Sequence, residues 1–248
     1  MNLILFENVF ESVRLEKEDP RTQHLRKVLK VETGDLVFIG FVDGPRARAR
    51  VTFKASDGSI ELTVIGTESS PRLLPIALMI GLSRPHTIRR ILFEAASLGV
   101  AEMHFFPAER SEPSYAKSRL WQTHEWHDRI LRGAEQAFVT SLPQVLMHTS
   151  VDSAMTAQKP SAVCLALDNY EAEGAVNQVL PDTCSNVVVA IGPERGWSPN
   201  ERAEFRSNGW KLIHIGSHVL RSETACVATV AAVATRLNLW CTQTQTTL

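Results

Sequence analysis

Val187-Val188-Val189-Ala190-Ile191 is an uninterrupted apolar run, and Gly192-Pro193-Glu194-Arg195-Gly196-Trp197-Ser198-Pro199 follows it directly. The run is short and mostly β-branched, which predicts a buried strand. The glycines and prolines after it predict a tight turn. A helical stretch, a second strand over 211–215 and another turn, Gly216 to Ala225, come next, and this turn leads into an apolar helix.

The chain therefore contains two successive strand–turn–helix units, each with a glycine-containing, charged loop. In an open α/β sheet, ligands bind outside the carboxyl ends of the strands, where such loops lie. The sequence predicts the active site at these two loops. The first turn taken alone is more typical of a purely structural role.

Composition limits the number of domains, the kinds of partner and the cellular compartment that the chain could have. The 248 residues are 44% hydrophobic and 21% charged, which suits one large domain or two smaller ones. The net charge of −1 means that contact with nucleic acid would depend on local basic patches. The four cysteines form no C-x-x-C pair, which favours a reduced cytosolic compartment and no metal site. No apolar stretch reaches the ~20 residues of a membrane span, so we expect a cytoplasmic protein without a membrane partner.

Residues 1–70 carry short β-type runs over 37–39, 41–42, 48–53 and 60–65, separated by Gly/Asp turns. They predict a small β-barrel or sandwich, with one short helix over 22–29. The pattern changes near residues 68–72, which places a domain boundary there. Residues 73–241 form the predicted second domain, and the polar stretch 242–248 is a predicted frayed tail.

Two basic features lie in the first domain. Arg21, Arg26 and Lys27 cluster near His24. The alternating residues Arg46, Arg48 and Arg50 would project from one face of a strand. Either this face is simply solvated, or it follows the phosphates of a nucleic acid, because arginine binds phosphate in a bidentate manner.

Strand-like and helix-like segments alternate in the second domain, which predicts a largely parallel sheet with helices packed around it. The predicted strands are 74–82, 102–106, 144–147 and 162–167, and the predicted helices are 87–98 and 120–138. The signatures of P-loop, dinucleotide-binding, nucleophile-elbow and zinc-protease sites are all absent.

The second loop carries an arginine where a helix begins. Ser222 or Thr224 could cap that helix. Arg221 is either a surface residue paired with Glu223 or a ligand for a phosphate or the polar edge of a base. The helix that follows, 224–240, is apolar nearly all round and must be covered on every side, which suggests a homodimer.

Two further polar features remain open. Glu135-Gln136 would serve a base edge or be solvated helix residues. Of the eight histidines, only His218 falls inside one of the two loops.

The motifs Gly192-Pro193-Glu194-x-Gly196-Trp197-Ser198 and Ile215-Gly216-x-x-Val219-Leu220-Arg221-x-Glu223-Thr224-Ala225 resemble those of the ribosomal RNA small subunit methyltransferase E family. Supporting matches are His24-Leu25, Leu98-Gly99-Val100, Arg110-Ser111 and Glu135-Gln136. The likeness spans nearly the whole chain, and the paired C-terminal motifs are its specific part.

The resemblance implies a SPOUT-type α/β domain with a trefoil knot, an N-terminal PUA-like RNA-binding barrel, and a homodimer. It implies N3-methylation of a uridine in the 16S rRNA of the small ribosomal subunit with S-adenosylmethionine. Arg221, Glu223 and Glu194 would be the catalytic residues. The implied cofactor-binding residues are Leu167, Ile191, Gly192, Pro193, Glu194, Gly196, Ile215, Gly216, Leu220, Ser222, Thr224 and Ala225. The implied RNA-binding residues are Arg21, His24, Arg26, Lys27, Arg46, Arg48, Arg50, Arg84, Arg110, Glu135 and Gln136.

The chain departs from the family pattern at four positions, and at one of them, Arg84 in place of a lysine, the charge is kept. Arg195 replaces a glycine, Ser97 a glutamate and Val139 an arginine. Two alternatives therefore stand beside the main hypothesis: a SPOUT enzyme acting on another RNA, and a non-catalytic RNA-binding or ribosome-assembly homologue.

Overall fold

The computed structural model describes residues 3–240, and the chain divides into two compact units. The first unit comprises Met1–Arg72 and Leu131–Leu142, and the second comprises Leu73–Ile130 and Pro143–Leu248. The sequence pattern predicts that 131–142 lies in the second domain, whereas this segment packs with the first unit. The predicted tail, 242–248, lies outside the described residues.

The first unit is built on a five-stranded sheet. Its strands, in order across the sheet, are β1 (Ile4–Phe6), β3 (Leu36–Phe41), β4 (Arg46–Phe53), β5 (Ile60–Glu68) and β2 (Ser12–Leu15). β1 runs parallel to β3, and the other neighbours are antiparallel. The register shifts between Arg48 and Ala49 of β4, where Ile65 of β5 has no partner in the register, which indicates a bulge in β5. The strands predicted for this region are confirmed, and two more, β1 and β2, form the edges of the sheet.

Helix α1 (Pro20–Lys27) covers the core of this sheet. Asp19 accepts a hydrogen bond from the backbone N–H of Arg21 at 2.8 Å, and Pro20 occupies the first turn, so the helix has a capped and preorganised start. Leu25 is fully buried among residues of β3, β4 and β5. The helix predicted over 22–29 is therefore confirmed, displaced by two residues.

The segment Leu131–Leu142 belongs to the first unit through backbone hydrogen bonds. The N–H of Leu3 donates to the carbonyl of Glu135 at 3.2 Å, and the N–H of Asp43 donates to the carbonyl of Thr140 at 2.9 Å. Leu3, Leu5 and Ala134 form a small buried cluster there. These contacts join segments distant in sequence, which is why hydrophobic periodicity alone did not assign them.

The second unit contains a seven-stranded sheet in which every neighbouring pair is parallel, as predicted. The strands in order are β10 (Gly174–Ala175), β12 (Lys211–His214), β9 (Val163–Leu167), β11 (Val187–Ile191), β6 (Leu74–Gly81), β7 (Val100–Phe106) and β8 (Gln144–Met147). All five residues of β11 are buried. Full burial on both faces explains the uninterrupted apolar run of this strand.

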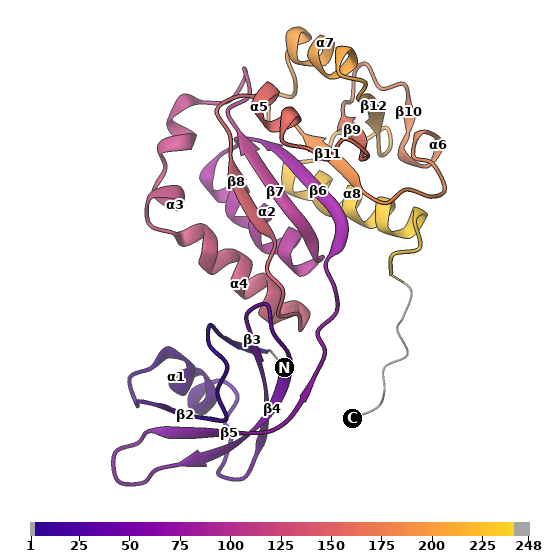
Figure 1. Cartoon of the computed structure of the whole chain (residues 1–248). Helices are drawn as coiled ribbons and strands as arrows, with labels where there is room; N and C mark the ends of the chain where they lie inside the picture. The colour runs from indigo at the N-terminus through magenta and orange to yellow at the C-terminus, as the bar shows by residue number, and fades with distance from the viewer. Residues whose placement is uncertain (1–2, 241–248) are drawn as a thin grey trace. The chain divides into compact units, whose positions relative to one another are not determined.

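Helices cover both faces of this sheet (Figure 1). Val188 and Ala190 pack with residues of α5 (Val151–Thr156) and α7 (Pro199–Ser207). The alternating residues of β11 point to the opposite face, where α2 (Pro85–Ser97) and α8 (Ser222–Arg236) lie against each other, with α8 against β11. The remaining short helices are α6 (Val176–Val179) and the 3₁₀ turn η1 (Pro113–Lys117).

The single helix predicted over 120–138 is wrong, because two helices occupy this stretch. α3 (Arg119–Gln122) and α4 (Glu125–Ala137) are separated at His124, whose φ is +55°. The Thr123 hydroxyl donates to the carbonyl of Arg119 at 2.9 Å and closes the first helix. The apolar periodicity continues across the break, so the sequence pattern did not reveal it. No helix among residues 3–240 is long and apolar enough to cross a bilayer.

Candidate functional site

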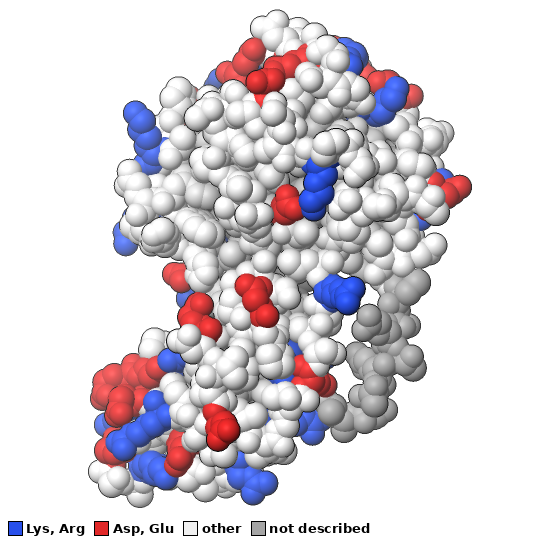
Figure 2. All heavy atoms as spheres, viewed as in Figure 1, with Lys and Arg blue, Asp and Glu red and all other residues white. Residues whose placement is uncertain are grey.

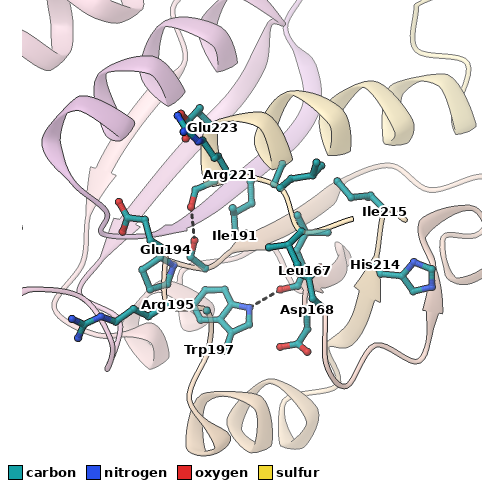
Figure 3. A pocket seen from close by; sticks show the side chains of 18 of the residues that line it. Leu167, Asp168, Ile191, Glu194, Arg195, Trp197, His214, Ile215, Arg221 and Glu223 are labelled. Carbon is teal, nitrogen blue, oxygen red and sulfur yellow. Dashed lines mark hydrogen bonds between the residues drawn. The ribbon is translucent and has the colours of Figure 1, made fainter. Parts of the chain in front are cut away.

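A cavity of ≈ 680 Å³ lies at the carboxyl ends of β9, β11 and β12 (Figure 3). Its walls are the loop after β9, the turn after β11 and the loop between β12 and α8, with the start of α2 beside them. This volume falls within the range typical of small-molecule sites. The two loops singled out in the sequence thus lie together, because parallel strands bring their carboxyl ends to one edge of the sheet.

The first wall is the turn after β11. The Gly196 N–H donates to the Pro193 carbonyl at 2.8 Å, and Gly196 has a left-handed φ of +64°. Pro193 packs so closely on Gly81, at the end of β6, that a Cβ there would lie 2.7 Å from the Pro193 Cδ. Glycine at both positions is required, for backbone conformation at 196 and for space at 81.

Trp197 anchors the same turn. Its side chain is 1% exposed, and its Nε1 donates to the carbonyl of Leu167 at 2.8 Å. Leu167 ends β9, so this hydrogen bond ties the first wall to the neighbouring strand (Figure 3). Helix α7 then begins with a capping box in which Ser198 and Glu201 exchange side-chain to backbone hydrogen bonds.

Glu194 and Arg195 occupy the exposed corners of this turn. The Oε1 of Glu194 accepts a hydrogen bond from the backbone N–H of Arg84 at 3.0 Å. Arg84 is the N-cap residue of α2 and its own side chain caps nothing. The Glu194 carboxylate therefore connects the turn to the start of α2.

The second wall is the loop before α8. The Ser222 hydroxyl donates to the carbonyl of Gly192 at 3.2 Å, which joins the two walls. Arg221 is the exposed N-cap residue of α8. The prediction that Ser222 or Thr224 caps the helix is wrong, because no side chain caps α8 and Ser222 bonds to Gly192 instead.

Glu223 forms an ion pair with Arg90 of α2 at 3.2 Å, and its side chain is only 13% exposed. The interpretation of Arg221 as the surface partner of Glu223 is therefore wrong. Among residues 3–240, no carboxylate forms an ion pair with Arg221. Its guanidinium group remains available at the cavity.

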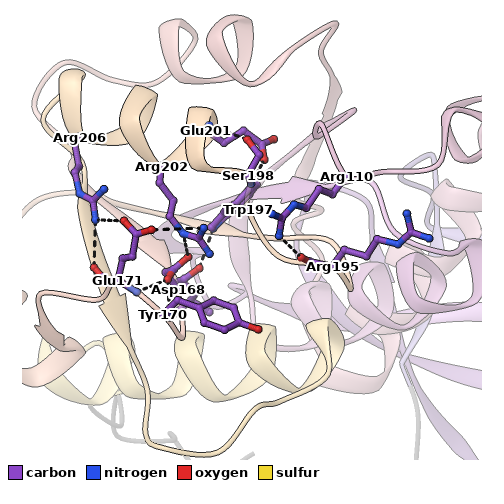
Figure 4. A network of polar contacts seen from close by, with 11 residues as sticks. Arg110, Asp168, Tyr170, Glu171, Arg195, Trp197, Ser198, Glu201, Arg202 and Arg206 are labelled. Carbon is purple, nitrogen blue, oxygen red and sulfur yellow. Dashed lines mark hydrogen bonds and ion pairs between the residues drawn. The ribbon is translucent and has the colours of Figure 1, made fainter.

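The third wall is the loop after β9, which a buried ion pair holds in place (Figure 4). Asp168 Oδ2 accepts a hydrogen bond from the Nε of Arg202 at 2.6 Å, and the two side chains are 2% and 7% exposed. Asp168 Oδ1 accepts from the backbone N–H groups of Tyr170 and Glu171, each at 2.7 Å. Glu171 in turn pairs with Arg206 at 2.7 Å.

Apart from Leu167, the residues of this wall were not predicted from the sequence. Asp168 directly follows a predicted strand, and a polar residue at a strand's carboxyl end was a usable signal. Nothing in the sequence marked Arg202, whose partner is 34 residues away. Tyr170, also on this loop, is 79% exposed and lines the cavity, and the Arg202 guanidinium lies 5.4 Å from its ring centroid.

The structure brings most of the predicted cofactor-binding and catalytic residues to the cavity. The residues that line it are Leu167, Ile191, Gly192, Pro193, Glu194, Gly196, Ile215, Leu220, Arg221, Ser222, Glu223 and Ala225. Gly216 and Thr224 do not line it. His218, the one histidine singled out, does, together with His86 and His214.

Several predicted RNA-binding residues of the first unit already have partners. Arg21 binds Asp19 through two hydrogen bonds, at 3.0 and 2.7 Å, and the pKa of Asp19 is lowered chiefly by this contact. Arg46 pairs with Glu68 at 3.0 Å. Arg26 lies over Phe53, and Arg48 over Phe38. Lys27 and Arg50 are exposed, and His24 is half-buried.

Figure 2 shows basic and acidic side chains interspersed over the visible face of the first unit. Glu135, in the same unit, is partly buried, and its Oε1 accepts a hydrogen bond from the N–H of Leu5 at 3.1 Å. Burial raises the pKa of Glu135. Gln136 is exposed. In the second unit, Arg84 lines the cavity and Arg110 donates to the carbonyl of Arg195 at 3.0 Å.

Within residues 3–240, no group of three His, Cys, Asp or Glu side chains is arranged to hold a metal ion. Cys164, Cys184 and Cys226 are free thiols. Burial, followed by the nearby charge of Glu94, raises the pKa of Cys226 to about 12. This buried thiol stays protonated and packs as a small apolar side chain in the core, so it is not a nucleophile.

The parallel α/β sheet and the cavity at its strand ends show where a ligand would bind, and comparison with known families shows the class of protein. The family model described as an RNA methyltransferase domain matches residues 69–234. The second unit is thus an RNA methyltransferase domain. A ribosomal RNA small subunit methyltransferase E of Treponema pallidum is 31% identical over 256 residues, covering 97% of this chain and 93% of that protein. The chain belongs to the ribosomal RNA small subunit methyltransferase E family.

Other relatives agree with this assignment. Ribosomal RNA small subunit methyltransferase E 1 of Borreliella burgdorferi is 26% identical and covers 96% of this chain and 99% of that protein. The crystal structure of a ribosomal RNA small subunit methyltransferase E from Neisseria gonorrhoeae, bound to S-adenosylmethionine, has a TM-score of 0.78 at 22% identity, covering 95% of this chain and 97% of that one. A Legionella pneumophila methyltransferase in complex with the same cofactor also gives 0.78, at 20% identity, covering 94% and 96%.

Proposed function

We propose that this protein transfers the methyl group of S-adenosylmethionine to N3 of a uridine in the 16S rRNA of the small ribosomal subunit, in the cytoplasm. The observation that carries the proposal is the position of Arg221, a cation without a carboxylate partner among the described residues, at a cavity formed by the two family motifs. The names of the relatives support the rRNA substrate, and the two cofactor-bound structures support the cofactor.

The cavity suits S-adenosylmethionine in size and in chemistry. Backbone groups of Gly192, Gly196 and Leu167 and apolar side chains of Ile191, Ile215 and Leu220 offer hydrogen bonds and apolar contacts to a nucleoside. Pro193, Glu194, Ser222 and Ala225 complete the set that would hold it. The cofactor supplies an electrophilic methyl group on a sulfonium.

The chain's own contribution is alignment and charge stabilisation. Uridine N3 would lose its proton before or during its attack on the methyl carbon, and the electron pair of the C–S bond that breaks in the same displacement would go to sulfur. The Arg221 guanidinium would stabilise the negative charge that develops on the uracil ring. Glu194 and Glu223 are the carboxylates available to accept the N3 proton, and each already has one partner, the Arg84 N–H and Arg90 respectively.

Three features of wider architecture belong to the same proposal: a trefoil knot in the second unit, a PUA-like barrel in the first, and a homodimer. The five-stranded, mostly antiparallel sheet with its register shift between β4 and β5 supports the barrel. The apolar residues Val227, Ala228, Ala231 and Ala232 of α8 remain partly exposed, and Trp240 is 48% exposed. A second copy of the chain would cover this apolar surface.

Mass mapping of 16S rRNA tests the proposal directly. A strain lacking the gene should lose one methyluridine, and expression of the wild-type chain should restore it. Fragmentation of the nucleoside distinguishes N3 from ribose or C5 methylation. Unchanged 16S rRNA together with a change in another RNA would establish the first alternative, a SPOUT enzyme with a different substrate.

Calorimetry with S-adenosylmethionine separates the second alternative. The proposed enzyme binds the cofactor with one site per chain. A non-catalytic assembly homologue with an occluded pocket would show no heat of binding and no change in any RNA, and that pair of results would refute the proposed function.

A further inference from the structure

The distribution of ion pairs in the second unit is uneven. Most of its cations are neutralised by a carboxylate: Arg89 and Arg129 by Glu125, Arg90 by Glu223, Lys159 by Glu102, Arg202 by Asp168, Arg206 by Glu171, Lys211 by Glu173 and Arg236 by Asp182. Within residues 73–130 and 143–240, the cations outside any ion pair are Arg84, Arg110, Lys117, Arg119, Arg195 and Arg221.

Most of these unpaired cations lie at the cavity or beside it. Arg84, Arg195 and Arg221 line it, and Arg110 contacts the turn that forms its first wall. Of the carboxylates that line the cavity, Asp168 is paired with Arg202 and Glu223 with Arg90, whereas Glu194 keeps its charge and accepts a hydrogen bond from the Arg84 N–H. The rim therefore carries uncompensated positive charge, which favours an anionic partner.

Arg195 fits the turn without strain. The left-handed residue of this turn is Gly196, whereas Arg195 is not among the residues with positive φ, so its position does not require glycine. Its side chain is exposed at the corner of the turn. The turn geometry thus permits an arginine here and directs it to solvent at the mouth of the cavity.

Arg110 lies against the same residue. Its Nη1 donates to the carbonyl oxygen of Arg195 at 3.0 Å (Figure 4). This single hydrogen bond leaves the other N–H groups of the Arg110 guanidinium free for a ligand. It also holds the end of Arg110 beside the backbone of this turn, from which the exposed Arg195 side chain extends (Figure 4), so that both arginines are available at the same turn.

We propose that Arg195 and Arg110 form a phosphate-binding pair that holds the RNA backbone beside the target nucleotide. This inference rests on the proposed function, because it assumes that a nucleotide enters the cavity. Arginine is suited to the role, since its planar fork binds two phosphate oxygens at once. Phosphate contacts of this kind position the strand without reading its sequence.

The experiment compares Arg195→Ala with the wild-type protein for binding to small ribosomal subunits purified from a strain lacking the gene. Filter binding is measured from about 50 to about 300 mM KCl at saturating S-adenosylhomocysteine. It gives the dissociation constant and its dependence on salt concentration. We expect a dissociation constant raised about 3- to 5-fold. We expect the slope of log K against log salt to fall by about 0.7, the value for one phosphate on a single strand.

Two further variants sharpen the test. Arg110→Ala should have the same effect, and the double variant should lose less than the two single effects combined, because both residues hold one phosphate. Lys211→Ala removes a charge from the same unit at a residue already paired with Glu173, and it should change neither quantity. Calorimetry with S-adenosylmethionine on each variant checks that cofactor affinity is unchanged.

An Arg195→Ala protein that binds subunits as Lys211→Ala does would overturn the phosphate pair while leaving the proposed function intact. Weaker cofactor binding in Arg195→Ala, without a change in the salt slope, would also overturn it and assign Arg195 to the cofactor. If the wild-type protein binds the cofactor and subunits but methylates nothing, the proposed function fails separately from the binding result.

Discussion

The Oε1 atom of Glu194 lies 3.0 Å from the backbone nitrogen of Arg84, and this hydrogen bond joins the turn after β11 to the start of α2. It gives Glu194 a structural role that is separable from any role in proton transfer. Glutamine can accept the same hydrogen bond, whereas alanine cannot.

We therefore predict that Glu194→Gln keeps its affinity for S-adenosylmethionine and that Glu194→Ala weakens it about 5-fold, as expected for the loss of one hydrogen bond. Calorimetry measures both. The turnover of Glu194→Gln then reports on proton transfer: a loss of about 100-fold at unchanged affinity would identify Glu194 as the base. Equal affinities for the Gln and Ala variants would contradict the structural role.

Arg221 should act on the chemical step. Replacing it with Ala removes the cation proposed to stabilise the developing uracil charge, and we expect kcat to fall at least about 100-fold. The affinity for S-adenosylmethionine should stay within about twofold, since no hydrogen bond within residues 3–240 depends on the Arg221 guanidinium. Single-turnover methylation of small subunits measures the first quantity and calorimetry the second. Full turnover in Arg221→Ala would remove this residue from the mechanism.

The Asp168–Arg202 pair should matter for stability more than any surface ion pair of the second unit. Arg202→Met leaves the buried Asp168 carboxylate without its cation, and we expect a loss of about 3 kcal/mol in the free energy of unfolding. Urea denaturation followed by tryptophan fluorescence measures it. The double change Asp168→Asn with Arg202→Met should recover part of the loss because no buried charge then remains.

Lys211→Ala is the matched control for that prediction. Lys211 and Glu173 are 58% and 41% exposed in their side chains, and solvent screens such a pair. Its removal should change the free energy of unfolding by less than about 0.5 kcal/mol. Similar losses in the free energy of unfolding for Arg202→Met and Lys211→Ala would show that burial does not increase the contribution of the Asp168–Arg202 pair to stability.

Acid sensitivity should follow from Glu125. Hydrogen bonds from Arg89 and then Arg129 lower the pKa of Glu125 from 4.5 to about 2. Because the folded-state pKa is the lower one, the unfolded chain takes up the proton first as the pH falls. The stabilisation is complete above pH 4.5 and is lost as the pH falls from there towards 2.

Comparing Glu125→Gln with wild type isolates this group from the other carboxylates. Urea denaturation of both proteins is measured at a series of pH values. The difference between their urea midpoints should be largest near about pH 7 and should shrink steadily from about pH 4.5 to about pH 3. A difference that is constant over this range would show that the ion pairs of Glu125 do not contribute to acid stability.

Local sequence signals were enough to predict most elements of the second unit. The β-branched run over 187–191, the glycine-proline turn after it and the apolar helix beyond Arg221 each correspond to an observed element. The parallel sheet followed from the alternation of strands and helices, since that order buries both faces of the sheet. The position of the cavity followed from the same rule, because loops at the carboxyl ends of parallel strands meet at one edge.

The sequence alone did not predict which residues distant in the chain contact each other. Glu223 pairs with Arg90, which is 133 positions away in the chain, and not with Arg221. The Asp168–Arg202 pair and the packing of 131–142 with the first unit also depend on contacts between distant segments. Hydrophobic periodicity reports which face of an element is buried, but not which element covers it.

The sequence by itself thus determined the family motifs, the parallel sheet and the two loops of the cavity, because these depend on residues close together in the chain. The tertiary structure alone decided which charges at the cavity are neutralised. That choice depends on which distant carboxylates approach each guanidinium group within about 4 Å. It leaves Arg195, Arg110 and Arg221 unpaired where an RNA phosphate and a uracil ring would enter.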